Sequence, residues 1–209
     1  MRLADYLTPL PLIAVLRGIT PEEIPAVSRA LADEGFRVLE VPLNSPRPFE
    51  SIRLLARQFG DRCLVGAGTV IAIADVVRVR DAGGKLIVMP HADTAVIHEA
   101  KGLGMVCVPG VATPTEAFAA LGAGADGLKM FPAEALPPAA LKAWRAVLPR
   151  EALVFAVGGM RADNLAQYWA VGANGFGTGS NLYAPGADPA KVRAAAAAYA
   201  AGFRALPLR

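Results

Sequence analysis

Eight short apolar segments recur along the chain at a nearly regular interval, and this spacing constrains the fold more than any other feature. Each segment begins about 20 to 26 residues after the one before it. That interval is too long for a β-hairpin but long enough for a strand, a loop and a helix. The segments are residues 13–18, 38–43, 64–70, 86–90, 106–110, 127–132, 153–159 and 175–180.

The stretches between these segments carry helix signals. Helices are predicted over residues 21–36, 113–124, 161–173 and 189–206. Thr113 or Thr115 could cap the second of these helices, and Asp163 could cap the third, because their side chains accept hydrogen bonds from free N–H groups at a helix start.

The apolar segments are nearly continuous and do not alternate strictly, which is typical of parallel strands buried on both faces. Eight β/α units in 209 residues predict a single (β/α)8 TIM barrel over residues 1–209. The alternative is a doubly wound open sheet, which usually needs only five or six strands. In a barrel, functional groups lie at the C-terminal ends of the strands.

Composition narrows the classes of function. Hydrophobic residues make up 54% of the chain and charged residues 19%, which excludes a disordered protein. The 21 basic residues are scattered, so no nucleic-acid partner is expected. No signal peptide or apolar stretch of membrane-spanning length is found, so no membrane partner is expected.

Cys63 and Cys107 lie in or beside apolar segments. Two buried free thiols are favoured over a disulfide, and free thiols indicate a reducing compartment, the cytoplasm.

Two charged residues interrupt apolar strands. Lys129 lies within the sixth segment, where desolvation would lower the pKa of its amine and let it attack a carbonyl. Glu40 lies within the second segment and could move protons for that reaction. The structural alternatives are a lysine whose head reaches solvent and a glutamate that is merely the buried partner of Arg17 or Lys129.

Candidate binding groups lie near the ends of two other segments. Arg17, near the end of the first segment, could hold a carboxylate or phosphate, or it could be an ordinary arginine of the barrel rim. Thr69, near the end of the third segment, could hydrogen-bond a substrate carboxylate or hydroxyl.

Glycines cluster at the last two strands. In such barrels the loops after strands seven and eight often bind phosphate through backbone N–H groups and a helix N-terminus. The candidates are Gly158, Gly159, Gly179 and Ser180, although turn glycines alone would give the same pattern. No metal-ligand cluster, P-loop or dinucleotide fingerprint is found, so no metal and no cofactor is predicted.

Together these residues indicate Schiff-base chemistry on a phosphorylated, acidic small molecule. The chain resembles the class I aldolases that act on 2-keto-3-deoxy-6-phospho sugar acids. The matching stretches include PLIAVLRGITPEE, GFRVLEVPLNSP, GAGTV, GLKMFPAE and FAVGGMRADNLAQYWAVGANGFGTGSNLY. The resemblance covers nearly the whole chain.

The resemblance implies roles for the same residues. Lys129 would form the Schiff base, Glu40 would be the acid–base group, and Arg17 and Thr69 would hold the keto-acid end. The phosphate would be bound by Gly158, Gly159, Gly179 and Ser180. The products would be pyruvate and D-glyceraldehyde 3-phosphate. The family also implies a homotrimer.

Two positions bear on the sugar epimer. Gluconate-type members tend to carry an arginine four residues after the glutamate and a threonine before the Gly-Gly pair, where this chain has Asn44 and Val157. The chain is closer to the galactonate type, and activity on both epimers remains an alternative. It departs from that type at Asn181 and His91, where aspartate and asparagine are expected.

Two other classes of function compete with an aldolase. A different phosphate-binding barrel enzyme, such as an epimerase or isomerase, would need no lysine in its sixth strand. A ligand-binding or scaffold barrel would leave Lys129 and Glu40 together unexplained.

Overall fold

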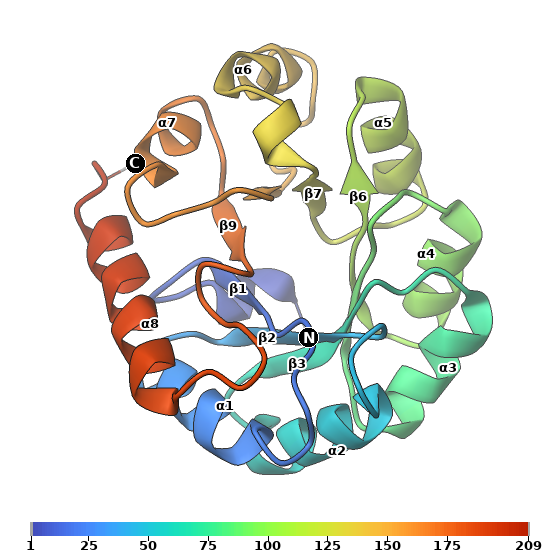
Figure 1. Cartoon of the computed structure of the whole chain (residues 1–209). Helices are drawn as coiled ribbons and strands as arrows, with labels where there is room; N and C mark the ends of the chain where they lie inside the picture. Colours follow the sequence, from blue (N-terminus) through green and yellow to red (C-terminus); the bar gives the residue numbers. More distant parts are fainter. Residues whose placement is uncertain (1, 209) are drawn as a thin grey trace.

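The computed structural model describes residues 2–208. Within them nine strands form one parallel sheet, and helices cover its outer face (Figure 1). The strands are β1 (Leu12–Val15), β2 (Val38–Pro42), β3 (Leu64–Gly68), β4 (Leu86–Val88), β5 (Val106–Val108), β6 (Gly110–Val111), β7 (Leu128–Met130), β8 (Val154–Val157) and β9 (Gly175–Thr178). The helices are α1 (Ile24–Asp33), α2 (Pro48–Phe59), α3 (Ile73–Asp81), α4 (Thr94–Gly102), α5 (Pro114–Gly122), α6 (Pro138–Arg145), α7 (Leu165–Ala170) and α8 (Pro189–Arg204). Two short 3-10 helices, η1 (Leu3–Tyr6) and η2 (Ala133–Ala135), complete the described elements.

The nine strands make an eight-stranded barrel because β5 and β6 are one barrel strand interrupted at Pro109. Their order runs β5-β4-β3-β2-β1-β9-β8-β7-β6, so the first and last strands are neighbours. Proline has no N–H to give to a ladder, which splits the strand. The Met89 N–H donates to the Val108 carbonyl (3.2 Å) and the Lys129 N–H to the Pro109 carbonyl (2.8 Å), which closes the ring. The predicted barrel is confirmed, and the open doubly wound sheet is wrong.

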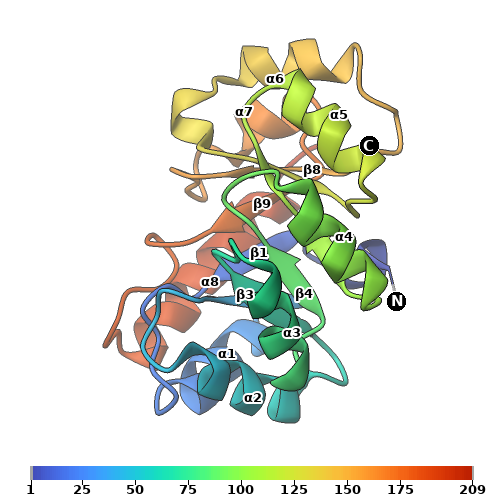
Figure 2. The same ribbon diagram turned by 90° about the vertical axis from the view of Figure 1, so that its right-hand side faces the viewer.

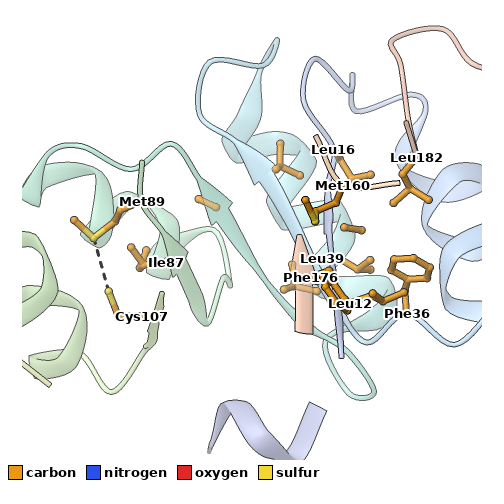
Figure 3. Packing of buried hydrophobic residues seen from close by; sticks show 14 of the residues in the cluster. Leu12, Leu16, Phe36, Leu39, Ile87, Met89, Cys107, Met160, Phe176 and Leu182 are labelled. Carbon is orange, nitrogen blue, oxygen red and sulfur yellow. Dashed lines mark hydrogen bonds between the residues drawn. The ribbon is translucent and has the colours of Figure 1, made fainter. Parts of the chain in front are cut away.

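Successive strand side chains point to opposite sides of the barrel wall. Outward-pointing residues such as Leu12, Leu39 and Phe176 pack beneath the helices in a continuous apolar layer (Figure 3). Inward-pointing residues form a second cluster with Leu3 of η1. The segment that contains η1 therefore packs against the barrel interior. In Figure 2 the dark blue segment that contains η1 lies to one side of the strands.

One helix cap is confirmed and another is wrong. Thr113 caps α5: its hydroxyl accepts from the Glu116 N–H, and the Glu116 carboxylate accepts from the Thr113 N–H. Asp163 does not cap α7, because that helix begins at Leu165 with Asn164 at the cap position. The Asn164 side chain closes the preceding turn by accepting from the Arg161 N–H (2.9 Å). Asp163 forms an ion pair with the Arg161 side chain instead (3.0 Å).

The prediction for the two cysteines is confirmed, since Cys63 and Cys107 are both buried and free. Cys107 lies in the outward-facing layer with its sulfur 3.8 Å from that of Met89 (Figure 3). Over residues 2–208, no helix combines the length and the apolar character that crossing a membrane requires.

Candidate active site

Lys129 and Glu40 both point into the barrel. Lys129 lies in β7 between Leu128 and Met130, whose side chains pack outward. Glu40 lies in β2 between Leu39 and Val41, which also pack outward. Alternation along a strand therefore turns both charged side chains inward. They are 7% and 1% exposed, so neither reaches solvent as an ordinary surface charge would.

The Glu40 carboxylate is buried without a full set of partners. Its Oε2 atom has no hydrogen-bond partner. Across residues 2–208, no ion pair joins Glu40 to Lys129 or to Arg17. Gly68 leaves room for the carboxylate, because a Cβ atom there would overlap it. An unpartnered buried carboxylate is costly, so the geometry does not match a simple structural ion pair.

Burial displaces the pKa of both groups toward neutrality. Burial raises the pKa of Glu40 to about 7, although the positive charges of Lys129 and Arg17 oppose the rise. Burial lowers the pKa of Lys129; Glu40 opposes this shift, and Arg17 adds to it. A carboxyl that titrates near neutrality can both accept and donate protons, and a lysine with a lowered pKa has more of the nucleophilic free amine.

A small cavity of about 10 Å³ lies inside the barrel between these groups. Both Glu40 and Lys129 line it, together with apolar side chains that include Val15 and Val157. This volume is close to the minimum needed by one water molecule. The two charged side chains therefore share a small, mainly apolar chamber.

Arg17 and Thr69 lie at the mouth above that chamber. The Arg17 guanidinium donates from Nη1 to Asn44 Oδ1 (2.7 Å) and to Thr69 Oγ1 (3.5 Å). Thr69 directly follows β3 with φ at 55°, a left-handed conformation that is unusual for a β-branched residue. Such strain is found at functional sites, and here the strained residue is in contact with the arginine. The two predicted keto-acid ligands are thus adjacent.

The predicted phosphate residues line a larger cleft at the mouth of the barrel, with a volume of about 520 Å³. Gly158 and Gly159 follow β8 with positive φ values of 106° and 66°, which glycine adopts without strain. Gly179 and Ser180 follow β9. The cleft is lined by Val15, Arg17, Gly18, Lys129, Phe131, Glu134, Val157, Gly158, Gly159, Met160, Gly177, Gly179, Ser180, Asn181, Tyr183, Ala184 and Pro185.

Two of the eight predicted residues lie outside the set that lines this cleft. Glu40 lines the chamber below, and Lys129 lines both that chamber and the cleft. Thr69 does not line the cleft but contacts Arg17, which does. The helix expected beside the glycines begins only at Leu165, so loop backbone forms this part of the cleft.

Three aromatic or acidic side chains of the cleft are not among the residues predicted from the sequence. Phe131 lies two positions after Lys129, and its ring centre is 4.4 Å from the lysine Nζ; the strand period could have revealed it. Glu134 in η2 places its carboxylate where a Cβ on Gly158 would collide. Tyr183 belongs to the loop after β9, and no local pattern indicates it.

The two departures from the galactonate type have different positions. Asn181 lines the cleft and donates from Nδ2 to the Met160 carbonyl (3.2 Å). His91 is exposed after β4 and is not among the residues that line the cleft. In residues 2–208 no group of three or more His, Cys, Asp or Glu side chains could hold a metal ion.

Comparisons with known proteins find relatives over nearly the whole chain. The family model for KDPG and KHG aldolase matches residues 3–193. The chain is 50% identical to a probable 2-dehydro-3-deoxy-6-phosphogalactonate aldolase of Rhizobium meliloti, over 94% of this chain and 92% of that protein. It is 47% identical to the 2-dehydro-3-deoxy-6-phosphogalactonate aldolase of Escherichia coli, over 96% and 98% of the two chains. A solved structure described as native KDPGal superposes with a TM-score of 0.93 at 46% identity, covering 98% of each chain.

Proposed function

The chain belongs to the KDPG and KHG aldolase family, and from that premise we propose that it cleaves 2-dehydro-3-deoxy-6-phospho-D-galactonate reversibly to pyruvate and D-glyceraldehyde 3-phosphate. The proposal depends above all on one observation: Lys129, buried and facing the barrel axis, lines both the cleft and the chamber that holds Glu40. A single amine is thereby open to substrate from above and to a proton carrier from below.

The first half of the reaction joins Lys129 to the substrate. The free amine attacks the C2 ketone to form a carbinolamine. Glu40 donates a proton to the departing hydroxyl, which leaves as water, and an iminium forms between Lys129 and C2. The pKa of about 7 for Glu40 suits a group that gives a proton here and must take one in the next step.

The second half breaks the carbon–carbon bond. Glu40, acting through water, takes the proton of the C4 hydroxyl while the C3–C4 electron pair moves into the iminium. D-glyceraldehyde 3-phosphate leaves, and an enamine of pyruvate remains on Lys129. Protonation at C3 regenerates an iminium, and addition of water releases pyruvate and the free amine. One water is released and one consumed, so the cleavage balances.

The rim groups would orient this substrate. Arg17 and Thr69 are adjacent at the mouth and would hold the keto-acid carboxylate. The two positive-φ glycines after β8, with Gly179 and Ser180, would bind the phosphate through backbone N–H groups and the serine hydroxyl. Binding at both ends would fix C2 above Lys129.

The decisive test is borohydride trapping with pyruvate, followed by peptide mapping. Borohydride reduces the iminium to a stable amine, so we expect a pyruvate-derived adduct on Lys129. Omission of either pyruvate or borohydride gives the control. No adduct in the folded protein, or an adduct on another lysine, would contradict the proposal.

A second candidate is activity on the C4 epimer, 2-dehydro-3-deoxy-6-phosphogluconate. The family is named for an aldolase of KDPG, and the iminium steps are the same for both epimers. The two relatives with 50% and 47% identity carry the galactonate name, and this favours the galactonate substrate. Cleavage rates with each pure epimer decide between them.

We also propose that the enzyme is a homotrimer in the cytoplasm. Large apolar side chains remain exposed on the surface, and an interface could cover some of them: Ile71, Ile73, Phe118 and Val147. The two free buried thiols are compatible with a reducing compartment. Light scattering on the purified chain measures the oligomeric state directly.

A further inference from the structure

The loop that follows β9, residues 179–186, forms one wall of the cleft. Ser180 and Tyr183 of this loop line the cleft. Its first turn is closed by the N–H groups of Leu182 and Tyr183, which donate to the Gly179 carbonyl (2.7 and 3.0 Å). Gly179 and Ser180 of this loop are two of the four residues that the proposed function assigns to phosphate binding.

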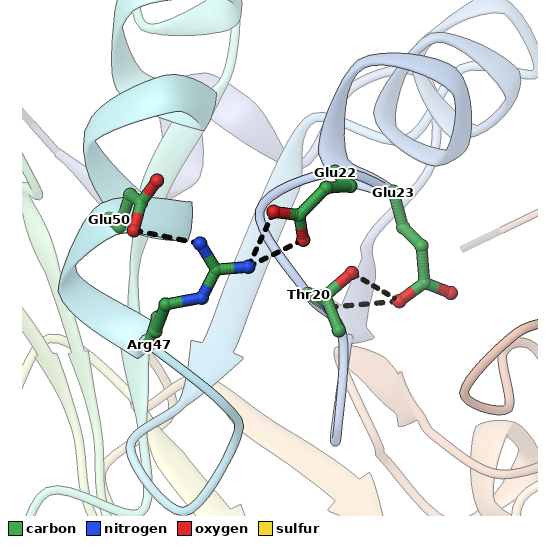
Figure 4. A network of polar contacts seen from close by, with 5 residues as sticks. All are labelled: Thr20, Glu22, Glu23, Arg47 and Glu50. Carbon is green, nitrogen blue, oxygen red and sulfur yellow. Dashed lines mark hydrogen bonds and ion pairs between the residues drawn. The ribbon is translucent and has the colours of Figure 1, made fainter.

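A carboxylate from the opposite end of the sequence holds this loop. Glu23 Oε1 accepts from the Tyr183 hydroxyl (2.8 Å) and from the Gly186 N–H (2.8 Å). Glu23 Oε2 accepts from the N–H and the hydroxyl of Thr20 (2.9 Å each), as Figure 4 shows. One side chain therefore links the loop after β1 to the middle and the end of the loop after β9.

The loop after β1 and the loop after β9 also pack closely against each other at Gly18 and Pro185. Gly18 has a φ of 82°, and a Cβ atom there would lie 2.6 Å from Pro185 Cγ. Gly18 directly follows Arg17, and its N–H donates to Ser45 Oγ (2.9 Å). The loop after β9 is therefore packed against the segment that carries the proposed carboxylate ligand.

Glu23 is suited to hold this contact because it stays ionised. Burial opposes ionisation, but hydrogen bonds from the Thr20 backbone, the Tyr183 hydroxyl and the Gly186 backbone outweigh it, and the pKa of Glu23 lies below its usual range. Hydrogen bonds to an ionised acceptor are stronger than those between neutral groups. Glu23 does not line the cleft, so it makes these bonds without contacting bound substrate.

We propose that Glu23 is a positioning residue for the phosphate end of the substrate: it fixes residues 179–186 so that Gly179 and Ser180 face Gly158 and Gly159 across the cleft. The inference rests on the proposed function for the identity of the bound anion. Glu23 takes no part in the chemistry at Lys129. Its loss therefore weakens binding of the phosphorylated substrate and spares pyruvate, which has no phosphate.

The neighbouring residue Glu22 provides a matched control. Its carboxylate points away from Glu23 and pairs with Arg47 (2.5 and 2.6 Å), as Figure 4 shows. It is 66% exposed and has no hydrogen bond to residues 179–186 within the described chain. Glu22→Gln and Glu23→Gln remove the same charge one residue apart. Removing negative charge near a phosphate site should by itself tighten anion binding, so an electrostatic role and a positioning role predict opposite signs.

The kinetic test compares these variants with the phosphorylated keto sugar acid and with pyruvate alone. We expect Glu23→Gln to raise KM for the phosphorylated substrate about tenfold, equivalent to about 1.4 kcal/mol, with kcat nearly unchanged. Tyr183→Phe removes only one of the four hydrogen bonds and should raise KM about threefold, which is within the range for a single hydrogen bond. Borohydride trapping of pyruvate should proceed at the wild-type rate in Glu23→Gln and Glu22→Gln, and Glu22→Gln should leave KM within about twofold. An unchanged or lower KM in Glu23→Gln, or pyruvate trapping slowed as much as cleavage, overturns the inference.

A second measurement does not depend on activity. Hydrogen exchange at the amides of Leu182, Tyr183 and Gly186 should become faster in Glu23→Gln but not in Glu22→Gln, and Kd for inorganic phosphate should rise about tenfold. If the wild-type protein failed to trap pyruvate, the proposed function would fall, whereas exchange and phosphate affinity would still decide the role of Glu23. Unchanged exchange in Glu23→Gln overturns the positioning role whatever the enzyme cleaves.

Discussion

The floor and the rim of the cleft differ in how solvent reaches their charged and polar groups. At the floor, Lys129 and Glu40 are buried and have displaced pKa values. At the rim, Arg17 and Ser180 are exposed, and loop-to-loop hydrogen bonds hold their surroundings. Burial can change the reactivity of a group, whereas an exposed group mainly contributes contacts. Reactivity and recognition are therefore separable in this barrel.

Removal of the floor amine should have the largest effect. Lys129→Ala leaves no group that can form the iminium, so cleavage should fall by at least about 10⁴-fold, the order seen when a covalent nucleophile is lost. Steady-state cleavage assays and pyruvate trapping measure this loss. Lys85→Ala is the control, because Lys85 is an exposed lysine at the entrance to β4. Activity of Lys129→Ala near that of wild type would rule out the Schiff-base mechanism.

Replacement of the floor carboxyl should cost less. Glu40→Gln keeps the size of the side chain but cannot move protons, so cleavage should slow by about 10²–10⁴-fold. Because the pKa of Glu40 is about 7, the wild-type pH–rate profile should have an inflection near pH 7 that the variant lacks. An inflection that persists in Glu40→Gln would assign the titration to another group.

Glu40→Gln also tests the energetic cost of burying this carboxyl. The pH dependence of stability that Glu40 contributes has the opposite sign to that of most carboxyls. The folded state raises the pKa of Glu40 from 4.5 to about 7, so between these values the folded chain keeps a proton that the unfolded chain has released. The stability linked to this proton is complete below pH 4.5 and is lost as pH rises through 7. Relative to wild type, Glu40→Gln should gain free energy of unfolding over this range, on the order of 3 kcal/mol. Urea denaturation at a series of pH values measures the difference, and a constant difference would contradict it.

The floor could be predicted from sequence more completely than the rim. Alternation around Lys129 and Glu40 is a local pattern, and a charged residue within an apolar strand stands out in it. Asp163 shows the limit of local rules: Asp163 and Asn164 are both competent caps, and the turn closed with Arg161 decides between them. The contact between Glu23 and Tyr183 joins residues 160 positions apart. It depends on the path of two loops, and neither loop carries a repeating pattern.

A substitution at Val157, which lies between the floor and the rim, should have a moderate effect, and only on the choice of substrate. Val157 lines both the chamber and the cleft, so Val157→Thr would place a hydroxyl beside the substrate. We expect it to shift preference toward the gluconate epimer by about 0.5–1.5 kcal/mol, the value of one hydrogen bond. The ratio of kcat/KM for the two epimers measures the shift. Val147→Thr makes the same change at an exposed position and should leave the ratio unchanged, as should Val157→Thr if the epimer argument is wrong.

The smallest effect on cleavage is expected at Cys107, which is buried like Lys129 but lies in the outward-facing layer, away from the cleft. Burial raises the pKa of its thiol to about 12; Asp126 adds to the rise and Lys101 opposes it. At pH 8 that shift from the ordinary value of 9.0 reduces the fraction of reactive thiolate by roughly 10³-fold.

Iodoacetamide should therefore leave Cys107 unlabelled in the folded protein and label it in urea, while pyruvate and borohydride still modify Lys129. Labelling of folded Cys107 at the unfolded rate would mean that the barrel wall opens readily, and burial would then not explain the reactivity of the floor. Protection of Cys107 beside a modified Lys129 would show that access through the cleft, rather than burial alone, makes the lysine reactive.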